Sequence, residues 1–197
     1  MAAELILAST SAARRSLLTA AGLSFRAVGS GVDEAAIKQT LSGRPPGEIA
    51  RHLARAKSEA VSRIEPSAIV IGADQVLDLD GTPFDKPASI EDARAQLLKL
   101  RGRTHALQSA VAIARSGETL EEFVGVARLT MRTFTEEFLD SYLRRMGDRV
   151  NSTVGGYEIE GAGLQLFASI DGDHTTILGL PMLPLLDVLR RHDLLER

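Results

Sequence analysis

The sequence predicts an α/β fold in which helices flank a mixed β-sheet. Short apolar runs typical of buried strands alternate with amphipathic helical segments, which is the pattern of an α/β protein. Both hairpin turns and helical crossovers connect the expected strands, so the sheet should contain antiparallel and parallel neighbours. The chain has 197 residues, 44% of them hydrophobic and 25% charged. These values are those of a globular protein, and we expect one domain over residues 1–197.

The expected order begins with a buried strand at residues 4–8, Glu-Leu-Ile-Leu-Ala. Three hydroxyl residues follow at 9–11, and a helical stretch over 12–21 ends at a glycine, which commonly terminates helices. A second short strand is expected at 24–28. Residues 31–46 contain glycine and a Pro-Pro pair, so we expect a polar connection there.

The middle of the chain contains the most regular patterns. Apolar residues recur at helical spacing over 47–64, which predicts one long amphipathic helix. The run at 68–72, Ala-Ile-Val-Ile-Gly, predicts a strand buried on both faces, and Asp80-Gly81 predicts a hairpin turn. A helix is expected over 90–100, because Ser89 can cap it and two acidic residues stand in its first turn.

The C-terminal half is expected to continue with strands before it returns to helix. Two long strands are expected around 104–115 and 121–133, separated by a Ser-Gly turn, and a helix over 136–146. The last quarter is rich in glycine and ends in a helix from Pro181 to about His192.

The composition excludes several kinds of chemistry. Cysteine is absent, which excludes disulfides, thiolate zinc sites and a cysteine nucleophile. The four histidines show no metal-ligand spacing, so a hard cation on carboxylates is the expected metal. An isoelectric point of about 5.8 and the lack of a basic run argue against a nucleic-acid partner. No apolar run is long enough to span a membrane and no signal peptide is seen, so we expect a cytoplasmic protein.

The first candidate site is the hydroxyl loop at the start of the first helix. Ser9 and its neighbours offer side-chain donors beside the free amides of a helix N-terminus, an arrangement that binds phosphate. Arg14 and Arg15 stand in the first turn, where cations are unfavourable unless an anion joins them. The alternative is an ordinary serine cap with two solvated arginines.

Asp74 is the second candidate, expected just after the buried strand at 68–72. A carboxylate at the end of such a strand can hold Mg²⁺ or take a proton from water, although a turn-capping Asp fits the pattern equally well. Two of the four lysines could neutralise polyphosphate. Lys57 borders the apolar stripe of its helix, and Lys86 precedes a proline close to the expected hairpin. Taken alone, each fits a solvated or snorkelling lysine better.

Two acidic segments complete the set of candidates. Glu34 lies in Val-Asp-Glu at 32–34, and Glu160 lies in Glu-Ile-Glu-Gly at 158–161. Each could ligate a metal or read a base edge, and each is individually more typical of a solvated surface pair. His105, inside an expected strand, is interpreted as a structural histidine rather than a general base.

Taken together, these segments resemble the Maf family of nucleoside triphosphate pyrophosphatases. Each motif is weak alone, but their order and spacing over nearly the whole chain are specific. The matching segments are residues 5–11, 14–15, 17–18, 32–34, 53–57, 71–74, 86–87, 100–105, 157–161 and 177–181.

The resemblance implies a cytoplasmic enzyme, usually dimeric, that depends on Mg²⁺ or Mn²⁺. Such an enzyme cleaves a nucleoside triphosphate between the α and β phosphates. It also implies a Maf/ITPase-like fold, in which an elongated mixed sheet flanked by helices forms two lobes around a cleft. By position in the motifs, Asp74 would be the proton acceptor and Glu34 would help hold the metal. The remaining matched residues would hold phosphates: Ser9, Arg14, Arg15, Lys57 and Lys86.

Within the family, this chain looks like the group that prefers 7-methyl-GTP, because Gln75 follows Asp74 and Glu160 precedes Gly161. A carboxylate can accept from a guanine edge or lie beside the cationic methylated ring. The chain departs from that group at Ala13, where the group has tryptophan, and at 108–109, where the family commonly has Thr-Gly. The alternatives are a dTTP/UTP pyrophosphatase of the same family, or a nucleotide-responsive regulator of cell division.

Overall fold

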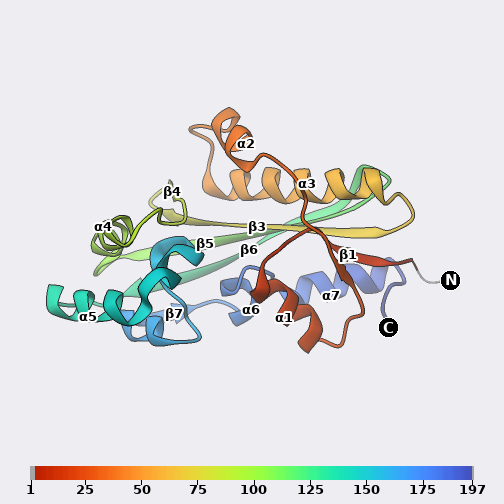
Figure 1. The fold of residues 1–197 in the computed structure, drawn as a ribbon. Coiled ribbons are helices and arrows are strands. Elements are labelled where there is room, and N and C mark those ends of the chain that lie inside the picture. The colour runs from red at the N-terminus through yellow and green to blue at the C-terminus, as the bar shows by residue number, and fades with distance from the viewer. Residues whose placement is uncertain (1–2, 197) are drawn as a thin grey trace. The chain divides into compact units, whose positions relative to one another are not determined.

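The computed structural model describes residues 3–196 and shows one mixed sheet with helices around it (Figure 1). The strands follow the order β2-β1-β3-β5-β6-β7, with β4 paired to β3. The strands are β1 (Leu5–Leu7), β2 (Arg26–Ala27), β3 (Ile69–Leu79), β4 (Thr82–Phe84), β5 (Thr104–Arg115), β6 (Glu118–Met131) and β7 (Phe167–Asp171). Strand β1 is parallel to β2 and β3, whereas β4 and β7 are antiparallel to their neighbours. The predicted mixed α/β sheet is confirmed.

Seven α-helices and three short 3₁₀ helices complete the described part of the chain. The helices are α1 (Ala12–Ala20), α2 (Glu34–Thr40), α3 (Pro46–Ile64), α4 (Ile90–Leu100), α5 (Glu136–Met146), α6 (His174–Ile177) and α7 (Met182–Arg191). The 3₁₀ helices are η1 (Gly147–Ser152), η2 (Val154–Gly156) and η3 (Ala162–Leu166). No helix within residues 3–196 is long and apolar enough to cross a membrane.

The chain divides into two compact units. The first comprises Met1–Gln75, Gln108–Val126 and Asp173–Arg197, and the second comprises Val76–Leu107 and Ala127–Gly172. Each unit is described by itself below. The expectation of a single domain over 1–197 stays a prediction.

In the first unit, alternate residues of the buried strands pack on opposite faces of the sheet. Leu5, Leu7 and Ile71 contribute to a core that includes Leu18 of α1 and Leu185 of α7. Ile6 and Val70 contribute instead to a smaller core with Val61 of α3. Helix α3 therefore covers one face, and α1 and α7 cover the other (Figure 1).

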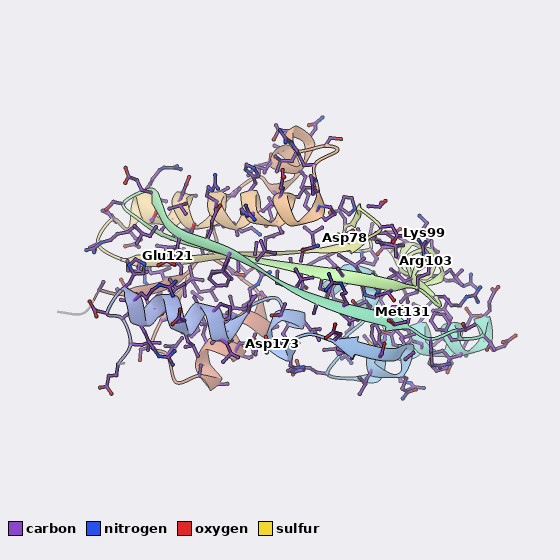
Figure 2. All side chains as sticks on the ribbon, turned by 180° about the vertical axis from the view of Figure 1, so that it is seen from behind. Asp78, Lys99, Arg103, Glu121, Met131 and Asp173 are labelled. Carbon is purple, nitrogen blue, oxygen red and sulfur yellow. The ribbon has the colours of Figure 1, made fainter. Side chains whose placement is uncertain are left out.

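Ion pairs tie other parts of the first unit to these layers. Glu121 of β6 lies against α7 (Figure 2), where it accepts from His192 Nε2 at 2.9 Å and pairs with Arg191. Arg55 of α3 donates to Glu122 at 2.9 Å through Nε.

In the second unit, buried aromatic and apolar side chains pack around the ends of β5 and β6. His105 and Tyr157 are buried and join through a 2.7 Å hydrogen bond between Nε2 and the phenol oxygen. Phe167 packs edge-on against Tyr157, with ring centroids 4.9 Å apart. The hydroxyl of Tyr142 on α5 donates to the carbonyl of Gly156 at 3.1 Å, which fixes the glycine-rich segment.

Local sequence signals predicted several elements correctly. Helices α4 and α5 have the expected bounds, and Ser89 caps α4 by accepting from the amide of Asp92. Asp80 and Gly81 form the expected hairpin turn, both with positive φ (52° and 82°), and join β3 to β4.

Two expectations were wrong, and one strand was not predicted. The strand expected at 68–72 continues to Leu79, so Asp74 lies inside β3 and not at its end. The connection expected at 31–46 contains α2, which has no buried residue and hence no apolar periodicity to predict it. The glycine-rich last quarter contains β7, whose five residues are mostly exposed and lack alternation.

Candidate active site

The hydroxyl loop joins β1 to α1 and folds as a capped helix start. Ser11 is the cap residue, and its Oγ accepts from the amide of Arg14 at 3.4 Å. Ser9 Oγ accepts from the amide of Ser11 at 3.2 Å. The first turn of α1 contains no acidic residue, so its dipole favours an anion from elsewhere. The loop therefore combines the ordinary serine cap with a local field that suits phosphate.

Arg14 turns into the first unit rather than into solvent. Its Nε donates to the carbonyl of Gly179 and its Nη1 to that of Ala73, both at 2.9 Å. Burial lowers the pKa of Arg14, and the charges of Asp74 and Glu34 oppose that shift. The solvated alternative is therefore wrong for this residue. Within the described chain Nε and Nη1 bind protein acceptors, which leaves Nη2 for a ligand.

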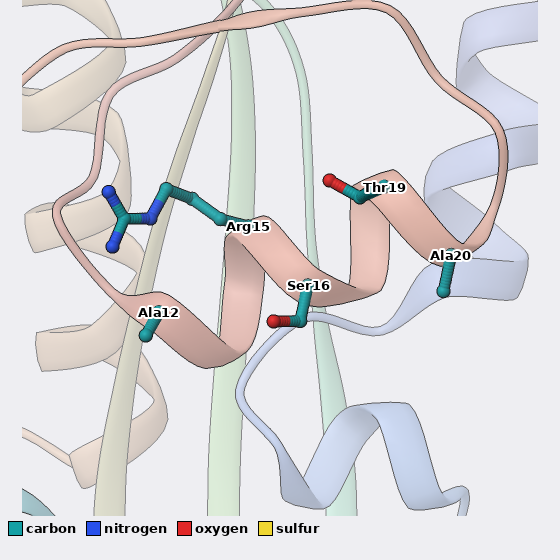
Figure 3. A pocket seen from close by; sticks show the side chains of 5 residues that line it. All are labelled: Ala12, Arg15, Ser16, Thr19 and Ala20. Atoms are coloured by element: carbon teal, nitrogen blue, oxygen red, sulfur yellow. The ribbon is translucent and has the colours of Figure 1, made fainter.

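Arg15 lies on the exposed face of α1. It lines a pocket of about 400 Å³ together with Ala12, Ser16, Thr19 and Ala20, all of the same helix (Figure 3). No carboxylate lines this pocket, and Ala13, which is half-buried, is not among its lining residues. The two adjacent arginines thus point in different directions, because successive helical residues are rotated by about 100°.

The centre of the site is a buried lysine between two carboxylates. Lys57 of α3 donates from Nζ to Asp74 Oδ1 at 2.6 Å and pairs with Glu34 Oε1 at 2.8 Å. Lys57 is 6% exposed and Asp74 is 7% exposed, whereas the Glu34 side chain is 48% exposed. Ion pairs in such a low-dielectric setting persist only when the partners are held in place. The solvated-lysine alternative is wrong for Lys57.

A close approach of α3 to β3 holds this pair together. A methyl group on Gly72 would lie 2.1 Å from the carbonyl oxygen of Ala54 and 2.6 Å from the amide of Ser58. Only glycine permits this spacing, which places Lys57 over Asp74 two residues further along the strand. A glycine inside a buried strand was the sequence signal for this approach.

Glu34 reaches the lysine from the first turn of α2. Asp33 caps that helix by accepting from the amide of Ala36 at 3.0 Å. Partial burial acts to raise the pKa of Glu34, but the hydrogen bond from Lys57 and the nearby cations outweigh it and keep the pKa below its usual value. Glu34 is therefore ionised at neutral pH.

Asp74 and Glu34 could bind Mg²⁺ if water and the substrate phosphates supplied the remaining ligands. Among residues 3–196, no group of three His, Asp or Glu side chains could hold a metal ion. Mg²⁺ commonly binds through one or two carboxylates and completes its shell with water and substrate phosphates. Asp74 and Glu34 fit that donor set.

Gln75 lies on the opposite face of the sheet from Asp74, because successive strand residues alternate. Its Nε2 donates to Ser109 Oγ at 2.8 Å and to the carbonyls of Thr176 and Ile177 at 3.1 and 3.0 Å. In the sequence, residues 108–109 stand out only as a departure from the family pattern. Ser109, which is fully buried, is thus a site residue that the sequence motifs did not predict.

Lys86 and Glu160 belong to the second unit, and both are exposed. Gln96 of α4 steadies the segment before Lys86 by donating to the carbonyl of Asp85 at 3.2 Å. Two residues before Glu160, Glu158 accepts from Arg149 Nε at 3.2 Å. The roles of Lys86 and Glu160 stay predictions.

His105 also belongs to the second unit. Burial lowers its pKa to about 4, and its Nδ1 has no hydrogen-bond partner in the described chain. A neutral buried imidazole agrees with the structural interpretation of this residue.

The chain matches one protein family and is similar to curated relatives over nearly its full length. Residues 4–192 match the family described as Maf-like protein. The chain is 48% identical over 191 residues to a nucleoside triphosphate pyrophosphatase of Rhodopseudomonas palustris, covering 97% of this chain and 95% of that protein. It is 46% identical over 198 residues to a 7-methyl-GTP pyrophosphatase of Brucella abortus, covering 100% of both.

Another relative is similar over nearly the whole chain, and one solved structure aligns with only part of it. A 7-methyl-GTP pyrophosphatase of Rhizobium johnstonii is 50% identical over 192 residues, covering 96% of both chains. A HAM1 protein structure from Coxiella burnetii aligns with a TM-score of 0.45 and 14% identity, over 66% of this chain and 73% of that one.

Proposed function

Because this chain belongs to the Maf family, we propose that it is a nucleoside triphosphate pyrophosphatase with a house-cleaning role. It would cleave the bond between the α and β phosphates and release a nucleoside monophosphate and pyrophosphate. Full-length relatives at 46–50% identity are named for this activity or for its 7-methyl-GTP form. The observation that carries the proposal is the buried Asp74 carboxylate, paired with Lys57 beside Glu34.

We propose that Asp74 and Glu34 hold Mg²⁺ or Mn²⁺ together with the substrate phosphates. When bound there, such a cation supplies charge neutralisation and makes a water molecule more acidic. The other parts of the reaction fall to the chain's own residues.

Asp74 acts as the proton acceptor in this proposal. Lys57 occupies Oδ1, so Oδ2 takes the proton as the water oxygen attacks the α-phosphorus. The bond between that phosphorus and the bridging oxygen breaks, and the bridging oxygen leaves with pyrophosphate. Cations and the helix N-terminus stabilise the charge that builds up on the leaving group. The phosphate-binding residues would be Ser9, Arg14 through Nη2, Arg15, Lys57 and Lys86.

We further propose 7-methyl-GTP as the preferred substrate. Two of the relatives above carry that name, and Glu160 could recognise the guanine edge or the methylated ring. By the family resemblance, Ala13 and Gln75 are the other two positions that would affect base preference, although the amide nitrogen of Gln75 is already bound by Ser109, Thr176 and Ile177. A dTTP/UTP preference is the alternative within the family. A homodimer in the cytoplasm also stays a prediction of the family resemblance.

The test is turnover of a panel of canonical and methylated triphosphates by the purified protein with Mg²⁺, with separation of the products. We expect a nucleoside monophosphate and pyrophosphate, and a kcat for Asp74→Asn that is lower by about 10³-fold with nucleotide binding retained. Asp187→Asn is the matched control, because Asp187 is an exposed carboxylate of α7 in the same unit. A diphosphate and orthophosphate as products would contradict the bond assignment, and an unchanged kcat would remove Asp74 from its role.

A further inference from the structure

Both residues that flank Asp74 in β3 are tied to one distant segment, residues 173–181. On the far side of the sheet from Asp74, the Gln75 amide donates to the carbonyls of Thr176 and Ile177. On the other flank, the Ala73 carbonyl accepts from Arg14, whose Nε donates to the carbonyl of Gly179. All of these contacts lie within the first unit.

Ser109 of β5 completes this network from a fully buried position. Its hydroxyl donates to the carbonyl of Thr176 at 2.8 Å and accepts from Gln75 Nε2 at 2.8 Å. One Gln75 N–H thus binds Ser109, and the other is shared between two backbone carbonyls. The amide nitrogen of Gln75 has no N–H left for a nucleobase.

The 173–181 segment is itself held firmly. Asp173, just before α6 (Figure 2), accepts from the amide of Thr176 at 2.8 Å, and Thr175 Oγ1 accepts from the amide of Met182 at 2.9 Å. Gly125 of β6 lets the segment approach closely, since a methyl group there would lie 2.6 Å from Pro181 Cγ. An anchor with these restraints can transmit a fixed orientation to the strand that it binds.

We infer that Ser109 and Gln75 are positioning residues that orient Asp74 from the rear of the sheet through the 173–181 segment. The inference rests on the proposed function, because Asp74 is the proton acceptor there. In this inference, Gln75 orients the catalytic carboxylate. Because its amide nitrogen is fully bound, Gln75 could recognise a base directly only if its amide oxygen accepted a hydrogen bond from the substrate. A small displacement of a reacting group can cost about 100-fold in rate, so such an anchor should affect kcat.

The first measurement is steady-state turnover of 7-methyl-GTP, UTP and dTTP by Ser109→Ala and Gln75→Met. For Ser109→Ala we expect kcat to fall about tenfold with KM within about twofold, by the same factor for all three nucleotides. Gln75→Met should lower kcat at least as far. The double variant should be no slower than Gln75→Met alone, because both residues act through one network.

Ser62→Ala is the matched control. Ser62 is also fully buried in the first unit, and its hydroxyl also donates to a carbonyl, that of Glu59, at 3.2 Å. We expect its kcat to match the wild type. Ser109→Ala should fold, because the Thr176 carbonyl keeps its bond from Gln75.

Two results would overturn the inference. One is an unchanged kcat in both single variants, and the other is a loss confined to one nucleobase, which would indicate direct base reading. If the wild type hydrolyses no triphosphate, the proposed function fails, and hydrogen exchange then decides the inference separately. Deuterium uptake over 69–76 should rise in Ser109→Ala and Gln75→Met, and unchanged uptake there would contradict the positioning role.

Discussion

Replacing Gly72 with alanine tests how the fold builds the charged centre of the site. The added methyl group would lie 2.1 Å from the carbonyl oxygen of Ala54, whereas ordinary contacts begin at 3.4 Å. The obstructing atoms include the amide of Ser58, so the clash is with the backbone of α3 and not with a flexible side chain. The helix must therefore move away from β3 by about 1.3 Å, the difference between 3.4 and 2.1 Å.

The size of the effect follows from that displacement. Overpacking a dense core typically costs about 1–3 kcal/mol, and a rigid obstruction places Gly72→Ala at the upper end, about 3 kcal/mol. For a chain of this length, that corresponds to a Tm lower by about 6–12 °C. Moving α3 by the same amount would open the 2.6 Å contact between Lys57 and Asp74 beyond hydrogen-bond distance. We therefore expect kcat to fall at least about tenfold.

The assay is urea unfolding followed by circular dichroism, together with triphosphate turnover at saturating substrate. Gly29→Ala is the matched control, because its added methyl group would meet only Thr10 Cγ2, at 3.6 Å. We expect the control to stay within about 1 kcal/mol of the wild type. Equal stability and equal kcat for the Gly72 and Gly29 variants would refute the argument that the close approach of α3 sets the geometry of the site.

Two further predictions concern buried ionisable groups. Lys57→Met leaves Asp74 and Glu34 without their shared cation, so the free energy of unfolding should fall by about 3 kcal/mol. Millimolar Mg²⁺ should then raise the Tm of the variant more than that of the wild type. An equal Mg²⁺ response would contradict this prediction. For His105, the unfolded chain takes up a proton near pH 6.5 but the folded protein only near pH 4, so stability falls as the pH drops through that window. His105→Gln should reduce this loss by up to about 3 kcal/mol in unfolding measured between pH 6.5 and 4, and an unchanged pH slope would refute it.

The parts of the fold that were predicted correctly depend on local signals. Ser89 with the acidic residues after it defines α4, and Asp80-Gly81 defines the hairpin, because caps and turns are satisfied by neighbours in the chain. Helix α2 gave no such signal apart from Asp33, since a helix without a buried face lacks apolar periodicity.

The candidate site was predicted in its residue types more than in its geometry. The sequence pattern indicates both Asp74 and Lys57 as candidates. Because a buried charge is costly unless it is paired, an Asp after an apolar run predicts the end of the strand as long as its partner is unknown. Ser109 was noted only as an unusual residue, because its partners are about 30 and 70 positions away in the chain.

The sequence by itself determined the α/β class, the order of most elements, the family and the set of chemical groups available for a phosphate-cleaving site. These properties follow from periodicity, turn chemistry and the order of motifs, which are all local or linear. Only the tertiary structure decided that Lys57 is buried between two carboxylates, that Arg14 turns inward while Arg15 faces solvent, and that Gln75 is bound from behind the sheet. The physical reason is that such contacts join residues far apart in the chain; for Lys57 and Asp74 they depend on how closely α3 approaches β3, and Gly72 sets that distance.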